Sequence, residues 1–316
     1  MRRVFVYEHL SGGRAPGETH ELRAMGLAMR DAIATDLLAL NDCDVSVATC
    51  EAATPVPRGT RAVAARAGES AVDFVARQAD GHPHVWVVAP ETDGVLMQLH
   101  RCVDPGRWLG CDGAAIKLAS GKRATVLHLA DAGIATPLAF EHAPEITRWV
   151  VKPDDGAGAL ATRLHASQDA ALADWSQRSR AGSPMAIEAW IEGEALSLSL
   201  LCRAGPPELL SINRQQLEVP PEGALAYRGV DINVASLSDA RGGVLTALAR
   251  AVGRALPGLR GFVGVDLVWH ARCGPVVIEV NPRVTCAYVG LSRALSRNLA
   301  AEVLAACGHA KAGGDA

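Results

Sequence analysis

GVDLVW at positions 264–269 and VVIEVNPR at positions 276–283 have the composition of two β-strands joined by a tight turn. Counting back from that turn sets Asp266 opposite Glu279, and alternation along the strand puts Asn281 on the same face. Carboxylate and amide oxygens, without histidine or thiolate, suit Mg²⁺. The pattern therefore predicts a magnesium site, although a half-exposed hairpin whose polar face meets water would give the same pattern.

The register of this hairpin decides whether the three side chains meet. A turn at 270–275 pairs Trp269 with Val276, whereas a longer turn would break the facing. In the predicted register the opposite face of the hairpin is apolar and carries Val265, Leu267, Ile278 and Val280.

The composition excludes several classes of protein. The chain has 316 residues, 49% hydrophobic and 21% charged, with a formal net charge of −3, so it is neither disordered nor fibrous. No cluster of basic residues and no run of ~18 apolar residues occurs, and we expect no nucleic-acid or membrane partner. Glu8 comes too early for a signal peptide, which favours a cytoplasmic location. The eight cysteines form no CxxC pair and indicate small buried residues rather than disulfides or a zinc site.

Residues 1–108 are predicted to form a Rossmann-like domain with a parallel sheet, because strands alternate with helices: strands at 4–7, 44–50 and 84–89, helices at 19–40 and 70–79. A glycine turn is expected at 11–13. Ligands of such sheets bind beyond the carboxyl ends of the strands. Segments 8–13 and 90–94 would lie there.

The rest of the chain is predicted to form two further units and a tail. Residues 109–185 carry helices at 118–132 and 167–180 and a strand at 148–152. Residues 186–308 read as an antiparallel or mixed sheet, with strands at 184–191, 195–202, 208–213, 261–269 and 275–281 and helices at 243–255 and 292–306. Residues 309–316 are expected to be a disordered tail.

WVVKPDDGAGA at 149–159 is a strand that ends in Lys152 and continues into a glycine-bearing loop. Backbone N–H groups around Gly156 and Gly158 could wrap phosphate oxygens, with the lysine supplying a charge to the same group. An ordinary turn is the simpler alternative. The glycine spacing also fits a dinucleotide fingerprint, but that motif should follow the first strand of a domain rather than occur in mid-chain.

Two further segments carry weaker signals. AIEAWIEGEALS at 186–197 is a strand, a turn and another strand, whose apolar part could hold an adenine and whose Glu194 could bind ribose hydroxyls, yet by itself it is a hairpin. SINRQQ at 211–216 ends a strand in amide and guanidinium groups, where a solvated run is the usual explanation.

Taken in order, these segments resemble the ATP-grasp superfamily of carboxylate–amine ligases. The motifs that carry the resemblance are ASGKRAT at 119–125, VKP at 151–153 with its glycine loop, 188–197, GVD at 264–266 and IEVNPR at 278–283. It implies a Rossmann-like domain followed by two α+β subdomains that clamp ATP. Within the superfamily, 7–13, 211–215 and 281–290 are most similar to the tyramine–glutamate ligases of methanofuran biosynthesis.

The resemblance implies roles for individual residues. Lys122 and Lys152 would hold the α- and β-phosphates, and the loop 154–159 would close over the γ-phosphate. Arg283 would sit at the transferred phosphate, with Lys152 and Arg214 also in the catalytic set. The remaining nucleotide and metal groups would be Glu188, Ala189, Trp190 and Ile191 at adenine, Glu194 at ribose, and Asp266, Glu279 and Asn281 at two Mg²⁺, with Mn²⁺ as an alternative. The substrate residues would be Glu8, Ser11, Gly12, Asn213, Arg228 and Tyr288.

The sequence departs from the family pattern in two places. Gly121 precedes Lys122 where the family usually has aspartate. Relatives that join alanines carry an arginine where this chain has Gly264, and a further lysine in a mobile loop. No lysine lies between Lys152 and Lys311, so Arg214 or Arg228 would supply the missing charge.

The implied activity is formation of an amide through an acyl phosphate, with release of ADP and phosphate. The expected substrates are glutamate and an amine such as tyramine or tyrosine, with Glu8 or Asp231 as the base, and a homodimer is possible for such ligases. The alternatives are a ligase for another amino-acid pair, a non-catalytic nucleotide-binding protein, and an NAD-dependent dehydrogenase that rests only on the misplaced glycine fingerprint.

Overall fold

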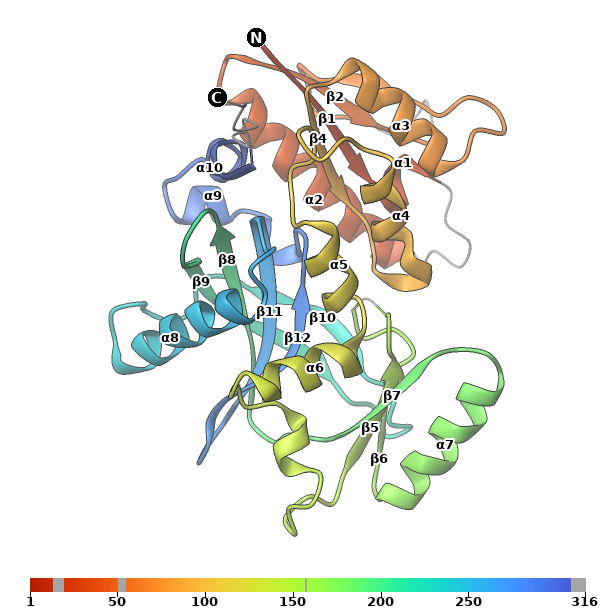
Figure 1. Cartoon of the computed structure of the whole chain (residues 1–316), viewed down its shortest axis with the longest axis vertical. Helices are drawn as coiled ribbons and strands as arrows, with labels where there is room; N and C mark the ends of the chain where they lie inside the picture. The colour runs from red at the N-terminus through yellow and green to blue at the C-terminus, as the bar shows by residue number, and fades with distance from the viewer. Residues whose placement is uncertain (14–19, 51–54, 157, 308–316) are drawn as a thin grey trace, which may run out of the picture.

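The described residues form three β-sheets, one parallel and two antiparallel (Figure 1). The computed structural model describes residues 1–13, 20–50, 55–156 and 158–307. The expected tail at 309–316 and position 157 of the glycine-bearing loop lie outside the described residues. The predicted fold class, α/β followed by α+β, is confirmed.

The N-terminal sheet has the strand order β3-β2-β1-β4, and every strand pair in it is parallel. Because β1 pairs with β2 on one side and β4 on the other, the carboxyl ends of β1 and β4 form the crevice in which such sheets bind ligands. Its elements are β1 (Arg2–Glu8), α1 (His9–Gly12), α2 (His20–Leu38), β2 (Cys43–Ala48), β3 (Arg61–Val63), α3 (Ala71–Gly81), β4 (His84–Val88), η1 (Thr92–Gly94) and α4 (Val95–Arg101).

Three elements of this part differ from the prediction. The expected glycine turn at 11–13 is the end of α1, which forms because the Glu8 carboxylate accepts the N–H groups of Leu10 and Ser11 as an N-cap. Strand β3 was not predicted, because it is short and largely exposed and its sequence shows no apolar alternation. Helix α4 was also missed, because Gly94 and the turn before it interrupt the helical pattern.

A three-stranded antiparallel sheet, β6-β5-β7, occupies the middle of the chain. Its surroundings are α5 (Gly113–Ala119), α6 (Lys122–Asp131), η2 (Pro137–Phe140), β5 (Trp149–Pro153), β6 (Arg163–His165), α7 (Gln168–Arg180) and β7 (Met185–Ala189). The single helix predicted at 118–132 was wrong: Gly121 is extended, and α6 begins at Lys122. This break places the lysine in the first turn of a helix.

The third sheet is antiparallel with the order β10-β9-β8-β11-β12. Its elements are β8 (Glu194–Cys202), β9 (Glu208–Glu218), β10 (Ala226–Asp231), α8 (Ala240–Ala255), β11 (Gly261–His270), β12 (Gly274–Asn281), η3 (Cys286–Tyr288), α9 (Leu291–Ala294) and α10 (Leu299–Cys307). Strand β9 is longer than predicted and β10 was missed. The helix predicted at 292–306 is two helices, because Ser296 adopts a left-handed conformation with φ of 53°.

The β11–β12 hairpin reaches the predicted facing by a different register. Trp269 pairs with Pro275 rather than Val276, and Ile278 is an extra residue in a β-bulge, so that Asp266 still pairs with Glu279. The predicted place of Ile278 on the apolar face of Val265 was wrong. Ile278 packs instead against a separate apolar cluster, which includes Val276 and Trp149.

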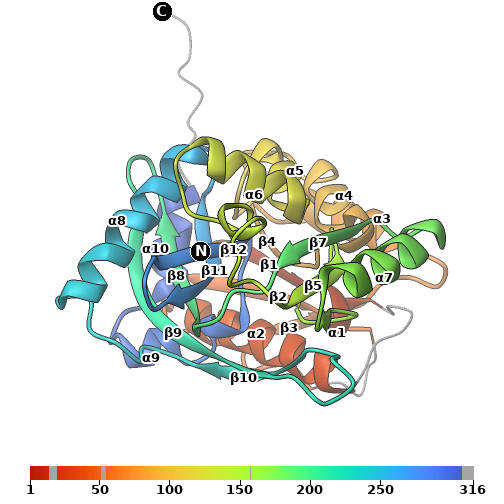
Figure 2. The same cartoon turned by 90° about the horizontal axis from the view of Figure 1, so that it is seen from below.

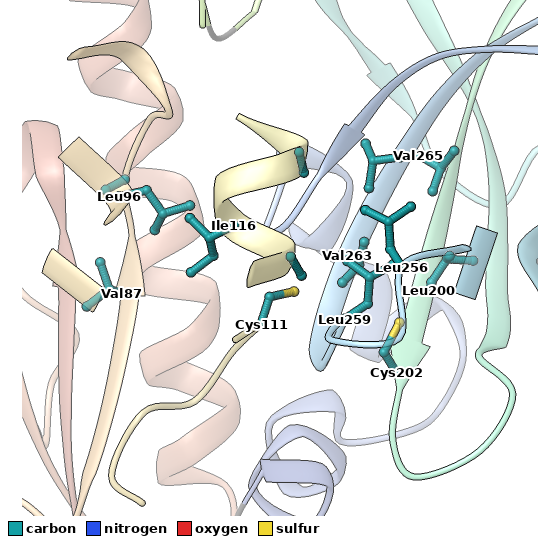
Figure 3. Close-up of a cluster of buried hydrophobic side chains, with 14 of the residues drawn as sticks. Val87, Leu96, Cys111, Ile116, Leu200, Cys202, Leu256, Leu259, Val263 and Val265 are labelled. Atoms are coloured by element: carbon teal, nitrogen blue, oxygen red, sulfur yellow. The ribbon is translucent and has the colours of Figure 1, made fainter. Parts of the chain in front are cut away.

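Two clusters of buried apolar side chains join the parallel sheet to the five-stranded sheet. Figure 3 shows Ile116 of α5 and Cys111, which precedes that helix, between Val87 and Leu96 on one side and Leu256 on the other, and all five side chains are buried. The apolar cluster of the three-stranded sheet is smaller and separate, so the two large sheets share the main core of the chain. No helix among the described residues is long and apolar enough to cross a membrane.

Candidate active site

A cavity of about 770 Å³ lies where the three sheets meet. Figure 2 shows β9 and β10 curving out of the five-stranded sheet, and their connecting turn reaches the three-stranded sheet through a hydrogen bond from Leu164 N–H to Gly223 O (2.8 Å). Most of the predicted site residues line this cavity: Glu8, Lys122, Lys152, Gly158, Glu188, Ala189, Trp190, Ile191, Asp266, Glu279, Asn281 and Arg283.

Lys122 reaches the cavity from the first turn of α6. Its ammonium lies 3.3 Å from Glu279 Oε1 and donates to the carbonyl of Gly156, so it joins the hairpin to the glycine loop. The start of α6 has no cap of its own at Gly121. The Asp154 carboxylate takes that place from the loop, accepting the N–H of Arg123 at 2.8 Å.

Lys152 and Glu188 form a buried ion pair across the neighbouring strands β5 and β7. The ammonium lies 2.7 Å from Glu188 Oε2, while Glu188 Oε1 is buried and has no hydrogen-bond partner among the described residues. Nε1 of Trp190 is also buried and has no partner in the part of the chain that the structure describes. Unsatisfied buried polar atoms are costly, and an acceptor and a donor in one wall fit a ligand such as adenine that supplies the partners.

The hairpin brings Asp266, Glu279 and Asn281 into the cavity. Asn281 Nδ2 donates to Asp266 Oδ2 at 3.2 Å, and Gln215 adds a second side-chain hydrogen bond to Asp266. Burial, followed by the negative charge of Glu279, raises the pKa of Asp266. Two crowded carboxylates with an amide are a hard-oxygen donor set that fits Mg²⁺, and no group of three His, Cys, Asp or Glu residues among those described offers another metal site.

Arg283 is held by Glu91, a residue that follows β4 in the N-terminal sheet. Arg283 Nε and Nη2 each donate at 2.8 Å to a different oxygen of Glu91, which is 3% exposed. Burial acts to lower the pKa of Arg283, but the charge and hydrogen bonds of Glu91 outweigh it and raise the pKa. Segment 90–94 was expected at the crevice from the sequence, but Glu91 was not singled out within it.

Glu8 lies at the carboxyl end of β1 and also lines the cavity. Burial raises the pKa of its carboxyl group, against the hydrogen bonds from Leu10 and Ser11. A side chain at Gly26 of α2 would collide with it, since an added Cβ would lie 2.6 Å from Glu8 Cδ. This close packing fixes Glu8 at the edge of the cavity.

One wall of the cavity is apolar. Helix α2 contributes Leu22, Met25 and Met29, and the β9–β10 hairpin contributes Val219 and Tyr227. None of these residues was singled out from the sequence, because apolar positions of a helix and of a strand carry no sign of which cavity they face. Such a wall suits an aromatic or aliphatic substrate body.

The remaining predicted residues do not line the cavity. Glu194 alternates with Gly193 and Ala195, which do line the cavity, so its side chain lies on the other face of the sheet. Its carboxylate binds Arg241 of α8 (2.6 Å) and Arg214 of β9 (2.8 Å) there. The ribose role of Glu194 and the catalytic role of Arg214 therefore lack the required geometry. Gln215, one residue further, is the side chain of this segment that faces the cavity.

Several predicted substrate residues instead have structural contacts. Arg228 binds Glu218 outside the cavity, and Tyr288 is buried with its hydroxyl donating to Asp36 at 2.8 Å. Asn213 is buried beneath the sheet surface and donates to Ser199 Oγ and Ser197 O.

The two remaining substrate candidates lie in α1. Ser11 donates to the carbonyl of Glu8, and Gly12 packs too closely against Ala48 and Tyr7 to carry a side chain. Gly156, although its carbonyl binds Lys122, also lies outside the cavity lining.

Comparison with known protein families identifies the family to which the chain belongs. A family model of the ATP-grasp domain matches residues 119–287, more than half of the chain, and a model of the pre ATP-grasp 3 domain matches residues 44–116. The chain belongs to the ATP-grasp family. This family was predicted from the sequence motifs, and the match confirms it.

Individual ATP-grasp proteins are similar over different lengths. The chain is 31% identical over 210 residues to the tyramine–L-glutamate ligase of Methanocaldococcus jannaschii, which is 65% of this chain and 57% of that ligase. The match thus spans less than two thirds of the relative. Among solved structures, an ATP-grasp superfamily protein from Archaeoglobus fulgidus superposes with a TM-score of 0.67 at 22% identity, covering 96% of this chain and 88% of its own. The D-alanine–D-alanine ligase of Bacillus anthracis complexed with ATP superposes with a TM-score of 0.65 at 16% identity, and the superposition covers 97% of each chain.

Proposed function

We propose that this ATP-grasp chain is an ATP-dependent ligase that joins a carboxylate to an amine through an acyl phosphate. The observation that carries the proposal is the convergence of Lys122, Lys152 and Arg283 with the Asp266–Glu279 pair on one cavity. Phosphoryl transfer requires positioned positive charge more than covalent help from the protein. The cavity offers such charge on rigid strands and on the first turn of a helix.

Nucleotide binding is assigned to the lysines and to β7. Lys122 and Lys152 hold the phosphates as compact point charges. Glu188 Oε1, unpaired among the described residues, accepts a hydrogen bond from the amino group of adenine. The apolar strand end through Ile191 packs beside the base. Gly193 allows this turn, since an added Cβ would lie 2.3 Å from the carbonyl oxygen of Trp269.

The metal set is Asp266, Glu279 and Asn281. Bound Mg²⁺ would neutralise charge on the phosphates during transfer. Lys122, 3.3 Å from Glu279, keeps that carboxylate oriented toward the phosphate end of the cavity. Arg283 lies on the same side and would stabilise the phosphoryl group as it moves.

The reaction transfers the γ-phosphoryl group of ATP to the substrate carboxylate, giving ADP and an acyl phosphate. The amine nitrogen then attacks the carbonyl carbon, the C–O bond to phosphate breaks, and an amide and phosphate result. An ammonium substrate must first lose a proton. Glu8 lines the cavity, whereas Asp231 is exposed and binds Gln216, so Glu8 is the base that the geometry favours.

The proposed substrates are glutamate, through its side-chain carboxylate, and an aromatic amine or amino acid such as tyramine or tyrosine, for a methanofuran-type cofactor. Similarity to the tyramine–L-glutamate ligase and the apolar wall with Met25, Met29 and Tyr227 both support this choice. A ligase for another amino-acid pair is the alternative within the same chemistry.

The experiment is phosphate release from Mg·ATP with glutamate and a panel of amines, followed by mass spectrometry of the products. We expect phosphate release that depends on both substrates and a glutamyl amide of an aromatic amine. Phosphate release with another pair would replace the substrates but keep the ligase. ADP binding without phosphate release for any pair would contradict the ligase and leave a nucleotide-binding protein.

A further inference from the structure

Glu91 and Arg283 link two parts of the chain that are 192 positions apart. Glu91 follows β4 of the N-terminal sheet, and Arg283 follows β12 of the five-stranded sheet. Arg283 lines the cavity while Glu91 lies behind it, so the carboxylate acts on the cavity through the arginine.

The pair fixes the plane of the guanidinium. Glu91 accepts from Nε and Nη2, both at 2.8 Å, and the carbonyl of Val284 accepts from Nη1 at 3.2 Å. A guanidinium carries five N–H donors in a rigid fork, and a bidentate carboxylate on one edge fixes its orientation. The N–H groups that remain are available to a phosphoryl oxygen.

Glu91 also counteracts a competing attraction. Glu279 and Asp266 both act electrostatically on Arg283 from the metal-binding hairpin. An arginine that moved onto those carboxylates would occupy the metal site and leave the phosphate. Glu91, which is buried and holds two donors of the guanidinium, opposes that movement.

The turn that carries Glu91 is itself held in place. Gly94 N–H donates to Glu91 O at 3.0 Å, and the left-handed Asp93 (φ 54°) turns its N–H toward Asp155 Oδ2, 2.9 Å away in the glycine-bearing loop. The position of Glu91 is therefore set from both the N-terminal sheet and the loop beside the nucleotide site.

We propose that Glu91 is a positioning residue for phosphoryl transfer, which holds Arg283 in the orientation that meets the transferred phosphate. The inference rests on the proposed function, because it assigns a helper to the arginine of that reaction. A direct role for Glu91, as the group that binds a substrate ammonium, is the competing possibility.

The test measures binding of Mg·ADP with and without aluminium fluoride, which mimics the phosphoryl group in transfer and needs neither substrate. We expect aluminium fluoride to tighten Mg·ADP binding by the wild-type chain. Glu91→Gln should weaken the aluminium fluoride complex about 10- to 100-fold while Mg·ADP alone binds within about 2-fold of wild type. Glu91→Asp, which keeps the charge on a shorter side chain, should recover part of the loss.

Asp36→Asn is the matched control, since it also alters a carboxylate that joins the N-terminal part to the C-terminal segment, through Tyr288 and Ser292. Aluminium fluoride should tighten Mg·ADP binding by Asp36→Asn as much as it does for the wild type. Thermal unfolding of each variant identifies loss of fold. A Glu91→Gln chain that weakens Mg·ADP alone to the same degree would overturn the positioning role.

The double variant Glu91→Gln/Arg283→Gln tests whether Glu91 acts through Arg283 or independently of it. In an Arg283→Gln background, Glu91→Gln should cause no further loss with aluminium fluoride. A full additional loss, or a raised KM for the amine with normal aluminium fluoride binding, would overturn the proposal in favour of direct substrate binding. If aluminium fluoride does not tighten Mg·ADP binding by the wild type and the wild type releases no phosphate, the proposed function itself fails. If aluminium fluoride tightens Mg·ADP binding equally in the wild type and in Glu91→Gln, only this inference is refuted.

Discussion

Lys152 Nζ lies 2.7 Å from Glu188 Oε2, and both side chains are almost fully buried. A pair in so little space depends on the size of the cation as well as its charge. Lys152→Arg keeps the charge but adds a planar fork to a residue that is 5% exposed. We expect phosphate release to fall by at least ~100-fold. Lys117→Arg, at an exposed position of α5, is the control and should retain normal turnover.

Glu188→Gln should weaken nucleotide binding. The substitution removes the ion pair with Lys152 and alters the oxygen that is free to meet adenine, so the Kd for ADP should rise about 10-fold or more. The ratio of the Kd for GDP to the Kd for ADP should become smaller. Calorimetric titration of both nucleotides measures this, with Asp174→Asn as the control because Asp174 pairs with Arg178 away from the cavity. An unchanged preference would show that Glu188 does not contact the base.

Asp154→Ala tests the cap that α6 receives from the glycine-bearing loop. Loss of the bond to Arg123 N–H should cost about 1 kcal/mol of unfolding free energy and also weaken ADP binding, because Lys122 lies in the same turn. Asp239→Ala removes the cap of α8, which accepts from Gly242 N–H at 2.7 Å. Urea unfolding should show a similar loss for both variants, and only the first should change ADP affinity.

The facing of Asp266 and Glu279 could be predicted from the sequence, although the register was wrong at the turn. The turn is shorter than assumed, and the bulge at Ile278 restores the offset. Lys122 and Lys152 were predictable because each belongs to a local motif. Their convergence on one cavity follows from the fold.

The contacts of other residues could not be predicted from local pattern. Glu91 gives no local signal, since its partner Arg283 is remote in sequence and the pair depends on how two sheets pack. Glu194 was assigned to the wrong side, because a shift of one residue along a strand moves a side chain to the other face. The helix boundaries that the sequence missed lie at left-handed or extended residues, which periodicity does not detect: Gly94 before α4, Gly121 before α6 and Ser296 after α9.

Gly26→Ala and Gly243→Ala contrast two helical glycines. Both should gain up to about 1 kcal/mol from helix propensity alone. At Gly243 nothing lies within 4 Å of the added Cβ, so stabilisation is expected, whereas at Gly26 the methyl group would displace Glu8. Gly26→Ala should therefore lower kcat/KM for the amine and leave the KM for ATP unchanged. Steady-state kinetics with each substrate varied in turn measure both values, and a normal kcat/KM for the amine would contradict the prediction.

The stability of the chain should carry a pH-dependent contribution from Asp36. Burial raises the pKa of Asp36 above its ordinary value, against the hydrogen bonds from Ser292 and Tyr288. The folded chain then binds this proton more tightly than the unfolded chain, so the contribution is complete at low pH and lost as pH rises through the folded pKa. Relative to Asp36→Asn, the wild type should lose unfolding free energy as the pH rises above about 4, the ordinary pKa of an aspartate. Parallel urea titrations at each pH measure the difference, and a constant difference would contradict the prediction.

The position of Ile116 between the two large sheets has a practical consequence. Residues 119–287, the part that matches the ATP-grasp domain, begin after this side chain and end before α10. A fragment with those limits would leave Leu256, Leu259 and Val263 facing water where Ile116 and Cys111 now cover them (Figure 3). The region that defines the family by sequence is thus not a piece that can be excised, and a stable truncation has to retain the N-terminal sheet.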